Sequence, residues 1–326
     1  MGDFQRGARA ASGRTVDEVP TRIDRWFSAT TLAAGLFVLA LLALVGFFLL
    51  YRSGDAFGAM GIWGFLTTEG WNFQEPYAFG VLALLAGTVL VALVAVAFAI
   101  PLGICAALFI TEYASLRGRR YLTAAVDLLA AIPSLLFGIW GFTYFGNYIV
   151  PLSEWLSSTF GFIPFFATEP GASLTGSIFI AGIIVALMTL PIIASVTREV
   201  FAQTPPGEKE AALALGSTRW GMIRAVVLPF GRGGIVGGSM LGLGRALGET
   251  IAVALLLPQV AAVQTQILQN GGATISGFIA VRVGTSGLEL SGLMAAGLVL
   301  FVVTLATNVL ASVVVARSRS GVGVEI

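Results

Sequence analysis

The sequence predicts an all-α membrane protein with six transmembrane helices. Of its 326 residues, 57% are hydrophobic and only 11% are charged, whereas roughly a quarter of the residues in a soluble domain are charged. The apolar residues gather in runs of about 20 or more, the length that an α-helix needs to cross the hydrocarbon core of a bilayer. A helix also satisfies its backbone polar groups internally, as a membrane requires.

Three residue types that are scarce or absent exclude several kinds of chemistry. The chain has no histidine, which removes histidine metal sites, histidine general bases and Ser-His-Asp triads. Cys105 is the only cysteine, so no intrachain disulfide forms. Lys209, the only lysine, stands in GEKEAA, which does not fit the phosphate-binding pattern G-x-x-x-x-G-K-[ST]. We therefore expect no ATP site and no cofactor on this chain, and any ATP-driven work would need another subunit.

Six apolar segments are expected to cross the membrane, and they divide the chain. A polar tail over residues 1–30 precedes a first span over residues 31–51, and a transmembrane domain over residues 79–315 precedes a short tail over residues 316–326. The second span is too long for one straight crossing, so we expect it to tilt or to kink at Pro101. The predicted spans are Thr31–Tyr51, Phe79–Ile110, Leu122–Val150, Leu174–Thr197, Gly234–Leu257 and Leu290–Val315.

The distribution of positive charge predicts the orientation. All but three of the 18 lysine and arginine residues lie in the two tails and in the loops after the second and fourth spans. The exceptions are Arg52 and Arg282 on the other side and Arg245 inside the fifth span. Basic residues accumulate on the cytoplasmic side of membrane proteins. We therefore expect both termini, and the loop over residues 198–232, to be cytoplasmic.

The cytoplasmic loop over residues 198–232 has the pattern of two short helices. Pro205 or Pro206 is expected to begin the first helix, Glu208 and Glu210 lie in its first turn, and Gly216 ends it. Ser217 or Thr218 caps a second short helix, which runs toward Val227 and is expected to stop at Pro229.

The apolar stretch AALAL in the first of these helices needs a covering surface. It either folds back on its own helix bundle or inserts into a groove of a cytoplasmic partner. The residues by themselves leave both alternatives open.

Two charges lie near the middle of the fifth span. Arg245 and Glu249 are four residues apart, which places them on the same face of a helix. A charge at this depth costs about 2.5–3.5 kcal/mol, so such residues face a cavity or a partner. Two interpretations stay open: a structural ion pair that locks the bundle, or a transient anion site in which Glu249 keeps Arg245 from holding the anion too tightly.

Two weaker features accompany this pair. Gly234, Gly238 and Gly242 repeat at a spacing of four, which is typical of a close helix–helix contact, and we expect that contact with another permease subunit. Asp127, about one turn into the third span, is expected to cap a helix or to pair with a base near the cytoplasmic interface.

The cytoplasmic loop resembles the EAA loop of ATP-binding-cassette (ABC) importer permeases, which has the pattern E-A-A-x3-G-x9-I-x-L-P. Only Val226, in place of the isoleucine, departs from it. The resemblance implies a type I importer, or MetI-like, permease fold, and a loop that docks onto an ATP-hydrolysing subunit and transmits its closure. The matching residues are Glu210, Ala211, Ala212, Gly216, Leu228 and Pro229.

Three further segments resemble the phosphate-specific branch of these permeases, and its PstC-type members more than its PstA-type members. They are GLGRALGET over residues 242–250, TEYASLRGRR over residues 111–120 and AIPSLLFGIWG over residues 131–141. The resemblance covers the chain from about Trp71 to Val315. It implies that Arg245 and Glu249 take part in translocation.

The resemblance also implies a complete machine in a bacterial inner membrane. Its other parts are a second permease subunit, PstA-type or homologous to this chain, two cytoplasmic subunits that bind ATP with magnesium, and an extracytoplasmic phosphate-binding protein. Membrane lipid surrounds the chain, and no nucleic-acid partner is expected.

The expected function is import of inorganic phosphate by alternating access. The nearest alternative is a permease for another oxyanion, sulfate or molybdate, against which GLGRALGET argues. An ion-coupled secondary transporter with Glu249 or Asp127 as proton site is a second alternative, but such a carrier needs no ATPase dock. A membrane enzyme is a distant third, since no cluster of catalytic polar residues is visible at either face.

Overall fold

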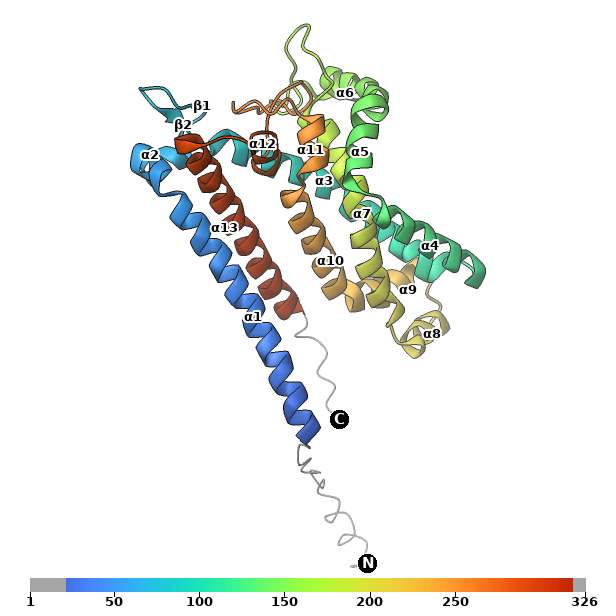
Figure 1. The fold of residues 1–326 in the computed structure, drawn as a ribbon. Helices are drawn as coiled ribbons and strands as arrows, with labels where there is room; N and C mark the ends of the chain where they lie inside the picture. Colours follow the sequence, from blue (N-terminus) through green and yellow to red (C-terminus); the bar gives the residue numbers. More distant parts are fainter. Residues whose placement is uncertain (1–21, 319–326) are drawn as a thin grey trace, which may run out of the picture. The chain divides into compact units, whose positions relative to one another are not determined.

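The computed structural model describes residues 22–318, with the side chains of residues 316–318 left aside, and it divides into two compact units, Met1–Phe48 and Leu49–Ile326. Of the predicted tails over residues 1–30 and 316–326, residues 1–21 and 319–326 lie outside the described residues. Six described helices are long and apolar enough to cross a membrane, which confirms the predicted α-helical membrane fold (Figure 1). These spans are Arg22–Arg52, Leu82–Tyr113, Ser134–Phe160, Ile178–Ala202, Arg219–Gly248 and Gly287–Val315.

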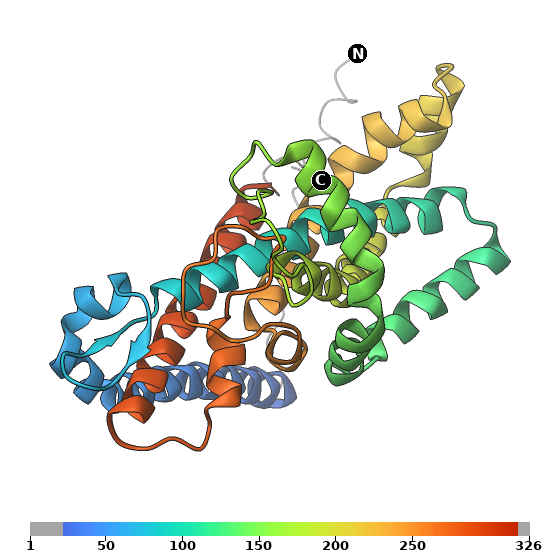
Figure 2. The same ribbon diagram turned by 90° about the horizontal axis from the view of Figure 1, so that it is seen from above.

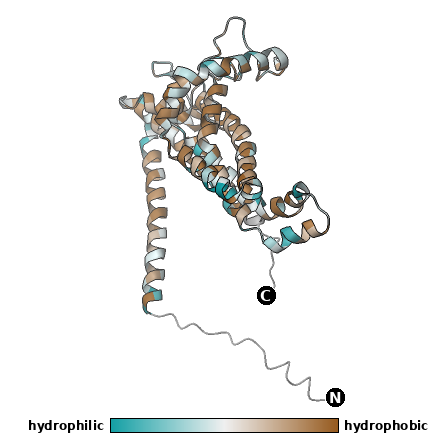
Figure 3. Ribbon diagram, turned by 90° about the vertical axis from the view of Figure 1, so that its right-hand side faces the viewer, coloured by the Kyte–Doolittle hydropathy of each residue, from teal (hydrophilic) through white to brown (hydrophobic). Residues whose placement is uncertain are grey.

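The first unit contributes one helix, α1 (Arg22–Arg52), whose last residues belong to the second unit. It begins at Arg22 rather than at Thr31, so the last part of the predicted tail over residues 1–30 is helical. Asp24 in its first turn favours this earlier start, because an acid there interacts with the helix dipole. Figure 3 shows that the long helices, α1 among them, are mainly hydrophobic along their length.

Between the first two spans, the chain is more ordered than a loop. Helix α2 (Gly54–Thr67) is followed by two short antiparallel strands, β1 (Trp71–Asn72) and β2 (Ala78–Phe79), in which Trp71 pairs with Phe79. Trp71 also meets Phe278 edge to face, with ring centroids 4.9 Å apart. Such aromatic contacts add to the stabilisation that burial provides, so the segment packs as a cap on one end of the second unit.

Helix α7 (Ile178–Ala202) is the centre of the second unit. Its most apolar stretch is 72% buried, against 28% or less for the other spans of this unit. It packs along α3 (Leu82–Leu108) and α10 (Leu228–Gly248), and the view in Figure 2 shows α3 crossing the unit beside α7. This burial makes α7 the surface on which the other helices are positioned.

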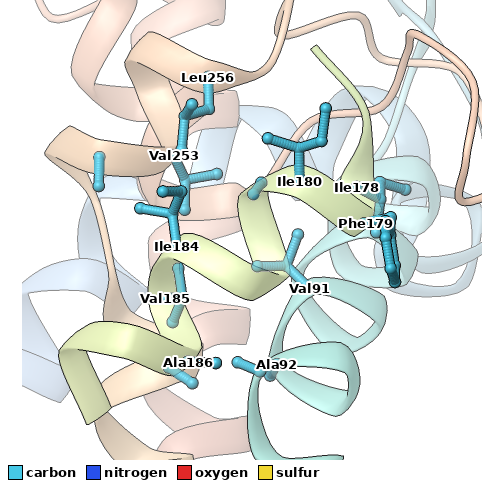
Figure 4. Packing of buried hydrophobic residues seen from close by; sticks show 14 of the residues in the cluster. Val91, Ala92, Ile178, Phe179, Ile180, Ile184, Val185, Ala186, Val253 and Leu256 are labelled. Atoms are coloured by element: carbon cyan, nitrogen blue, oxygen red, sulfur yellow. The ribbon is translucent and has the colours of Figure 1, made fainter. Parts of the chain in front are cut away.

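Small residues allow α3 and α7 to approach closely. Ala92 of α3 faces Ala186 of α7, and Val253 and Leu256 of α11 (Ile251–Leu256) lie beside Ile184 of α7 (Figure 4). At Gly182 of α7, a Cβ atom would lie 2.4 Å from a methyl carbon of Val94 on α3. Only glycine therefore fits at this crossing without a shift of one helix.

The third span differs from the prediction. The expected span Leu122–Val150 is wrong, because the chain breaks at Pro133 between α4 (Leu116–Ala131) and α5 (Ser134–Trp140). A proline disfavours helical backbone in the preceding residue, and Ile132 is extended with ψ 126°. The span runs instead over Ser134–Phe160, through a π-helical segment η2 (Gly141–Phe145) into α6 (Gly146–Phe160).

The boundaries of the second, fourth and sixth spans lie within about five residues of those predicted. Helix α3 continues through Pro101 and ends in a π-helical turn, η1 (Phe109–Tyr113). The remaining helices are α8 (Pro206–Ala214), α9 (Arg219–Met222), the π-helical η3 (Ile223–Val227), α12 (Ile275–Val281) and α13 (Gly287–Ser318).

Candidate functional site

The fifth span is broken at the residue that the sequence singled out. Helix α10 ends at Gly248, Glu249 is extended with φ −65° and ψ 126°, and α11 begins at Ile251. The predicted single span Gly234–Leu257 is therefore wrong. One local hydrogen bond accompanies the break. The hydroxyl of Thr250 donates to the carbonyl oxygen of Gly248 at 3.0 Å, so a carbonyl at the end of α10 has a partner outside the helix.

The break separates the two charges that the sequence placed on one helix face. Arg245 lies in the last turn of α10 and is exposed, whereas Glu249 follows the helix and is 8% exposed. Within residues 22–318, no ion pair joins them: the three acid–base pairs found there involve other residues. The locking ion pair, one of the two interpretations that the sequence left open, is absent from this conformation.

Neighbouring elements hold Glu249 in place. Its backbone carbonyl accepts a hydrogen bond of 2.6 Å from the hydroxyl of Ser276 on α12, and Ala246 and Leu247 are anchored in the core. Non-helical backbone at membrane depth occurs where protein covers it or where it lines a cavity. Broken helices of this kind form substrate sites in secondary transporters, so the break marks the place where α10 could meet a solute.

The exposure of Arg245 shows that this face of α10 is incomplete in a single chain. Arg245 lies in the last turn of the span Arg219–Gly248, not at the middle of a span as the sequence predicted, and a guanidinium that faces hydrocarbon inside a membrane is costly. Leu241, one turn earlier, is also exposed at 56%. The face that carries both residues must therefore meet a water-filled cavity or another subunit.

The glycine row of α10 has a different partner from the one expected. A Cβ atom on Gly234 would lie 2.5 Å from Val200 of α7, and one on Gly242 would lie 2.7 Å from Ile193 of α7. The row packs against α7 of the same chain. The predicted contact of these glycines with another permease subunit is therefore wrong, and the row instead fixes α10 on the central helix.

The first half of the coupling loop, residues 198–232, folds as predicted. Pro206 begins α8 and Gly216 follows it with φ 85°, a backbone conformation that favours glycine. The hydroxyl of Thr218 accepts from the N–H of Gly221 at 3.1 Å and so caps α9. The predicted helix–turn–helix is thus confirmed up to this point.

The second half of the loop departs from the prediction, because the helix does not stop at Pro229. Helix α9 passes through η3 into α10 without interruption, and the N–H of Leu228 bonds to the carbonyl of Ile223, five residues back. Pro229 lies inside this helix, and the π-helical turn η3 directly before it provides a changed hydrogen-bond pattern where the proline has no N–H to donate. Arg219–Gly248 is consequently one continuous helix.

The coupling loop both rests on its own bundle and presents a free face. Ala212 is half-buried against a cluster that includes Phe201 and Ile223. Glu210 and Ala211 are exposed, and so are the large apolar side chains of Leu213, Leu215 and Trp220. Each of the two alternatives for the AALAL stretch is therefore correct for part of it, and an uncovered apolar surface remains.

Two further contacts lie near this loop. Asp127 on α4 pairs with Arg198 at 3.8 Å, which agrees with the second of its two predicted roles, capping or pairing. Asp127 was expected inside the third span, but α4 lies before that span. Lys209 on α8 pairs with Glu112 of η1 at 2.6 Å. Sequence reasoning missed this second pair. Its only signal was that a lone lysine and an acid occur in two separate family-like segments.

At the other end of the bundle, Arg282 stands beside a shallow cavity of about 460 Å³ that α11 also lines. Its guanidinium lies 3.7 Å from the centre of the Phe278 ring and 3.9 Å from the carboxylate of Glu289, which also accepts from the indole N–H of Trp71. Burial lowers the pKa of Arg282, and the charge of Glu289 partly offsets this. The contacts with Phe278 and Glu289 hold the Arg282 side chain near the end of α11.

The sequence profile of the family described as "Binding-protein-dependent transport system inner membrane component" matches residues 99–320. The chain belongs to this family. It is a multi-pass membrane protein that serves as a translocation component, as expected, rather than as an enzyme.

Similar proteins narrow the class further. The chain is 39% identical over 312 residues to the phosphate transport system permease protein PstC 2 of Mycobacterium tuberculosis, covering 94% of this chain and 96% of that protein. It is 41% identical over 252 residues to the phosphate transport system permease protein PstC of Mycobacterium leprae, covering 76% and 77%. The predicted resemblance to PstC-type permeases is confirmed.

The fold has a counterpart among solved structures. A chain of a bacterial ABC transporter that imports the acidic polysaccharide alginate superposes with a TM-score of 0.51, covering 90% of this chain and 99% of that chain. The two are 20% identical, so the likeness concerns the fold alone. The predicted permease fold of ABC importers is confirmed.

Proposed function

We propose that this chain is a permease subunit of an ATP-driven importer of inorganic phosphate. The observation that carries the proposal is the similarity to PstC proteins along almost the whole chain, including the segment that holds Arg245 and Glu249. The exposed guanidinium of Arg245, one turn before the break after Gly248, supports it, because an uncovered cation on a membrane-spanning helix is available to an anion.

Arg245 and Glu249 have different roles in the proposed translocation of phosphate. The Arg245 guanidinium attracts phosphate and offers several N–H donors to its oxygens. Glu249, close along the chain but not ion-paired with Arg245, carries the opposite charge and shortens the stay of the anion. A site that held phosphate tightly would stop transport, since the solute must leave on the other side.

The energetics require a power source. Phosphate carries about −1.5 to −2 charges near neutral pH, and moving one charge against ~100 mV costs ~2.3 kcal/mol. Import therefore costs roughly 3–5 kcal/mol before any concentration gradient. ATP with magnesium on a partner subunit supplies this free energy in the proposed machine.

The partners follow from the two faces of the chain. One of the two cytoplasmic ATP-binding subunits docks on the coupling loop of this chain, through Glu210, Ala211 and the exposed apolar side chains beside them, and the other docks on the second permease subunit. A PstA-type permease covers the face of α10 that carries Arg245. An extracytoplasmic phosphate-binding protein delivers the solute at the opposite side. Both termini are cytoplasmic in this arrangement, in a bacterial inner membrane.

The test is uptake of labelled phosphate into right-side-out or reconstituted vesicles that carry the whole complex, with and without ATP enclosed on the ATPase side, after the proton gradient has been collapsed. The expected result is uptake that needs ATP and survives the collapse. Excess unlabelled sulfate or molybdate should leave it unchanged.

Uptake that ignores ATP and disappears with the gradient would make the chain a secondary transporter and Glu249 its leading proton site. Strong competition by sulfate or molybdate would instead assign the chain to another oxyanion. Each of these results contradicts the proposal at a different point.

A further inference from the structure

The single lysine of the chain ties the coupling loop to the end of the second span. Lys209 lies on α8, and its Nζ is 2.6 Å from Oε1 of Glu112 in η1, 97 residues earlier. The side chains are 21% and 7% exposed, respectively. A short, charge-assisted and largely buried pair of this kind is stronger than a surface salt bridge, which contributes about 0–1 kcal/mol.

Other side chains also hold η1 at this point. The guanidinium of Arg219 on α9 lies 5.3 Å from the centre of the Tyr113 ring. Arg119 of α4 donates from Nε to the carbonyl of Ile110 at 3.1 Å, and it also donates to the carbonyl of Thr111. These carbonyls belong to the last turn of the span, where intrahelical partners run out. The segment TEYASLRGRR is thus the surface that receives the coupling loop.

Apolar packing supports the same contact. Ala107 and Leu108 of α3 are buried together with Met222, Ile223 and Val227, which follow α8 directly in the chain. Ala212 of α8 packs against this cluster. The apolar cluster stabilises the contact but does not fix the exact position of α8, whereas the ion pair fixes where α8 lies on η1.

From η1, a displacement has a continuous route into the bundle. Helix η1 extends α3 without a break, and α3 packs along the central helix α7. A Cβ atom on Gly103 of α3 would lie 2.9 Å from Ile193 of α7, and Ile193 also contacts Gly242 of α10. Closely packed helices transmit movement because they resist compression.

We propose that the Lys209–Glu112 pair makes the second span follow the coupling helix, so that closure of the ATPase subunits moves α3 together with α10. This inference rests on the proposed function, because it assumes that the loop docks on an ATPase. Lys209 and Glu112 act as positioning residues in it. They would contact neither the phosphate nor the nucleotide.

The first test removes the charge of the lysine. Lys209→Gln in the whole complex, reconstituted in liposomes, should lower the phosphate taken up per ATP hydrolysed by about tenfold, as loss of a coupling free energy would. The ATPase subunits should still co-purify with the permease. Arg224→Gln is the matched control: it removes one positive charge from the same loop at an exposed residue outside every ion pair of residues 22–318.

The second test distinguishes the effect of the ion pair from the effects of Lys209 and Glu112 as single residues. Glu112→Gln leaves the lysine without a counter-charge and could impair folding, so the reversed pair Glu112→Lys with Lys209→Glu is made beside it. The reversed pair should recover at least half of the wild-type ratio. Unchanged uptake per ATP in Lys209→Gln, or a reversed pair no better than the single changes, would overturn the proposal.

A third measurement does not depend on phosphate. Hydrogen exchange of residues 109–113 in the complex should slow when ATP closes the ATPase subunits, and Lys209→Gln should remove this response while that of residues 206–214 persists. A response of residues 109–113 that survives in Lys209→Gln would contradict the inference. If wild-type vesicles took up no phosphate but showed the linked exchange response, the proposed substrate would be wrong and the role of the pair would stand.

Discussion

The coupling loop and the break after α10 are both family-like segments, but they differ in how complete they are. In the loop, Gly216 and Thr218 have the backbone conformation and the hydrogen bond that their positions require, and Lys209 has its counter-charge. At the break, Arg245 is exposed and outside the ion pairs of residues 22–318. The hydrogen bonds and the ion pair that shape the loop come from this chain, although its apolar face stays uncovered, whereas the charge of Arg245 at the break has no ion-pair partner among residues 22–318.

The comparison teaches how to separate folding from function. A residue whose partners lie in its own chain contributes to stability, and its loss is measured on the isolated subunit. A residue without such partners contributes to function through another subunit or the solute, and the effect of its loss is measured only in the working complex. The following changes test this division, beginning with the largest expected effect.

Arg245→Gln should lower phosphate uptake by about 100-fold, because it removes the charge and most of the donors at the break. Assembly and thermal stability of the complex should not change, since no ion pair of residues 22–318 is lost. Arg232→Gln, which removes an exposed arginine near the start of the same helix, is the control and should transport normally. Loss of assembly in Arg245→Gln would assign the residue a structural role.

Glu210→Arg should reduce ATP-dependent uptake by about tenfold or more, because it reverses a charge on the face that docks on the ATPase. The fold should persist, since Glu210 is exposed. Pull-down of the ATPase subunits together with circular dichroism of the permease measures both. Glu199→Arg, an exposed acid on α7, provides the comparison. Normal uptake in Glu210→Arg would remove the coupling role from this residue.

Gly234→Ala should destabilise the subunit by about 1–3 kcal/mol, because the added methyl group would lie 2.5 Å from a methyl carbon of Val200. Gly237→Ala, one turn further on, meets nothing closer than 3.9 Å and should be neutral or slightly stabilising. Thermal unfolding of the purified subunit in detergent distinguishes them. Equal melting temperatures for the two variants would mean that α10 is not fixed on α7 as described.

Thr218→Ala should have the smallest effect, about 1 kcal/mol, because it removes the hydroxyl that caps α9. The expected observation is faster hydrogen exchange over residues 219–222 with uptake nearly normal. Thr218→Ser keeps a capping hydroxyl and should exchange at the wild-type rate. If both variants behaved alike, the cap would contribute nothing measurable to the loop.

Local features were predictable from the sequence, and features that depend on distant contacts were not. The six spans follow from composition, and the loop helix with its Gly216 end follows from residue types within one or two turns. The Lys209–Glu112 pair joins positions 97 residues apart, and no local rule identifies it. The partner of the glycine row was misassigned for the same reason, because spacing indicates a close contact but not with which helix.

The misplaced boundaries have a different cause. The sequence predicted a tilt or kink at Pro101, a helix end at Pro229 and a span that runs through Pro133, yet α3 continues through Pro101, a continuous helix contains Pro229, and the chain breaks before Pro133. The effect of a proline depends on whether the preceding backbone can supply an alternative hydrogen-bond pattern, as η3 does before Pro229. The break after Gly248 contains no proline that could have indicated it. It is accompanied by hydrogen bonds from Thr250 and from Ser276, and Ser276 lies beyond a long loop.

The uninterrupted helix from Arg219 to Gly248 has a mechanical consequence. Its 30 residues make a rod of roughly 45 Å, and the glycine row that packs closely against Val200 and Ile193 of α7 lies in its second half. Such a surface is suited to serve as a fulcrum. If the rod tilted by ~10° about its middle, each end would swing by roughly 4 Å, and in opposite directions. A push on the cytoplasmic end would then shift the guanidinium of Arg245 the other way, as the two arms of a lever move.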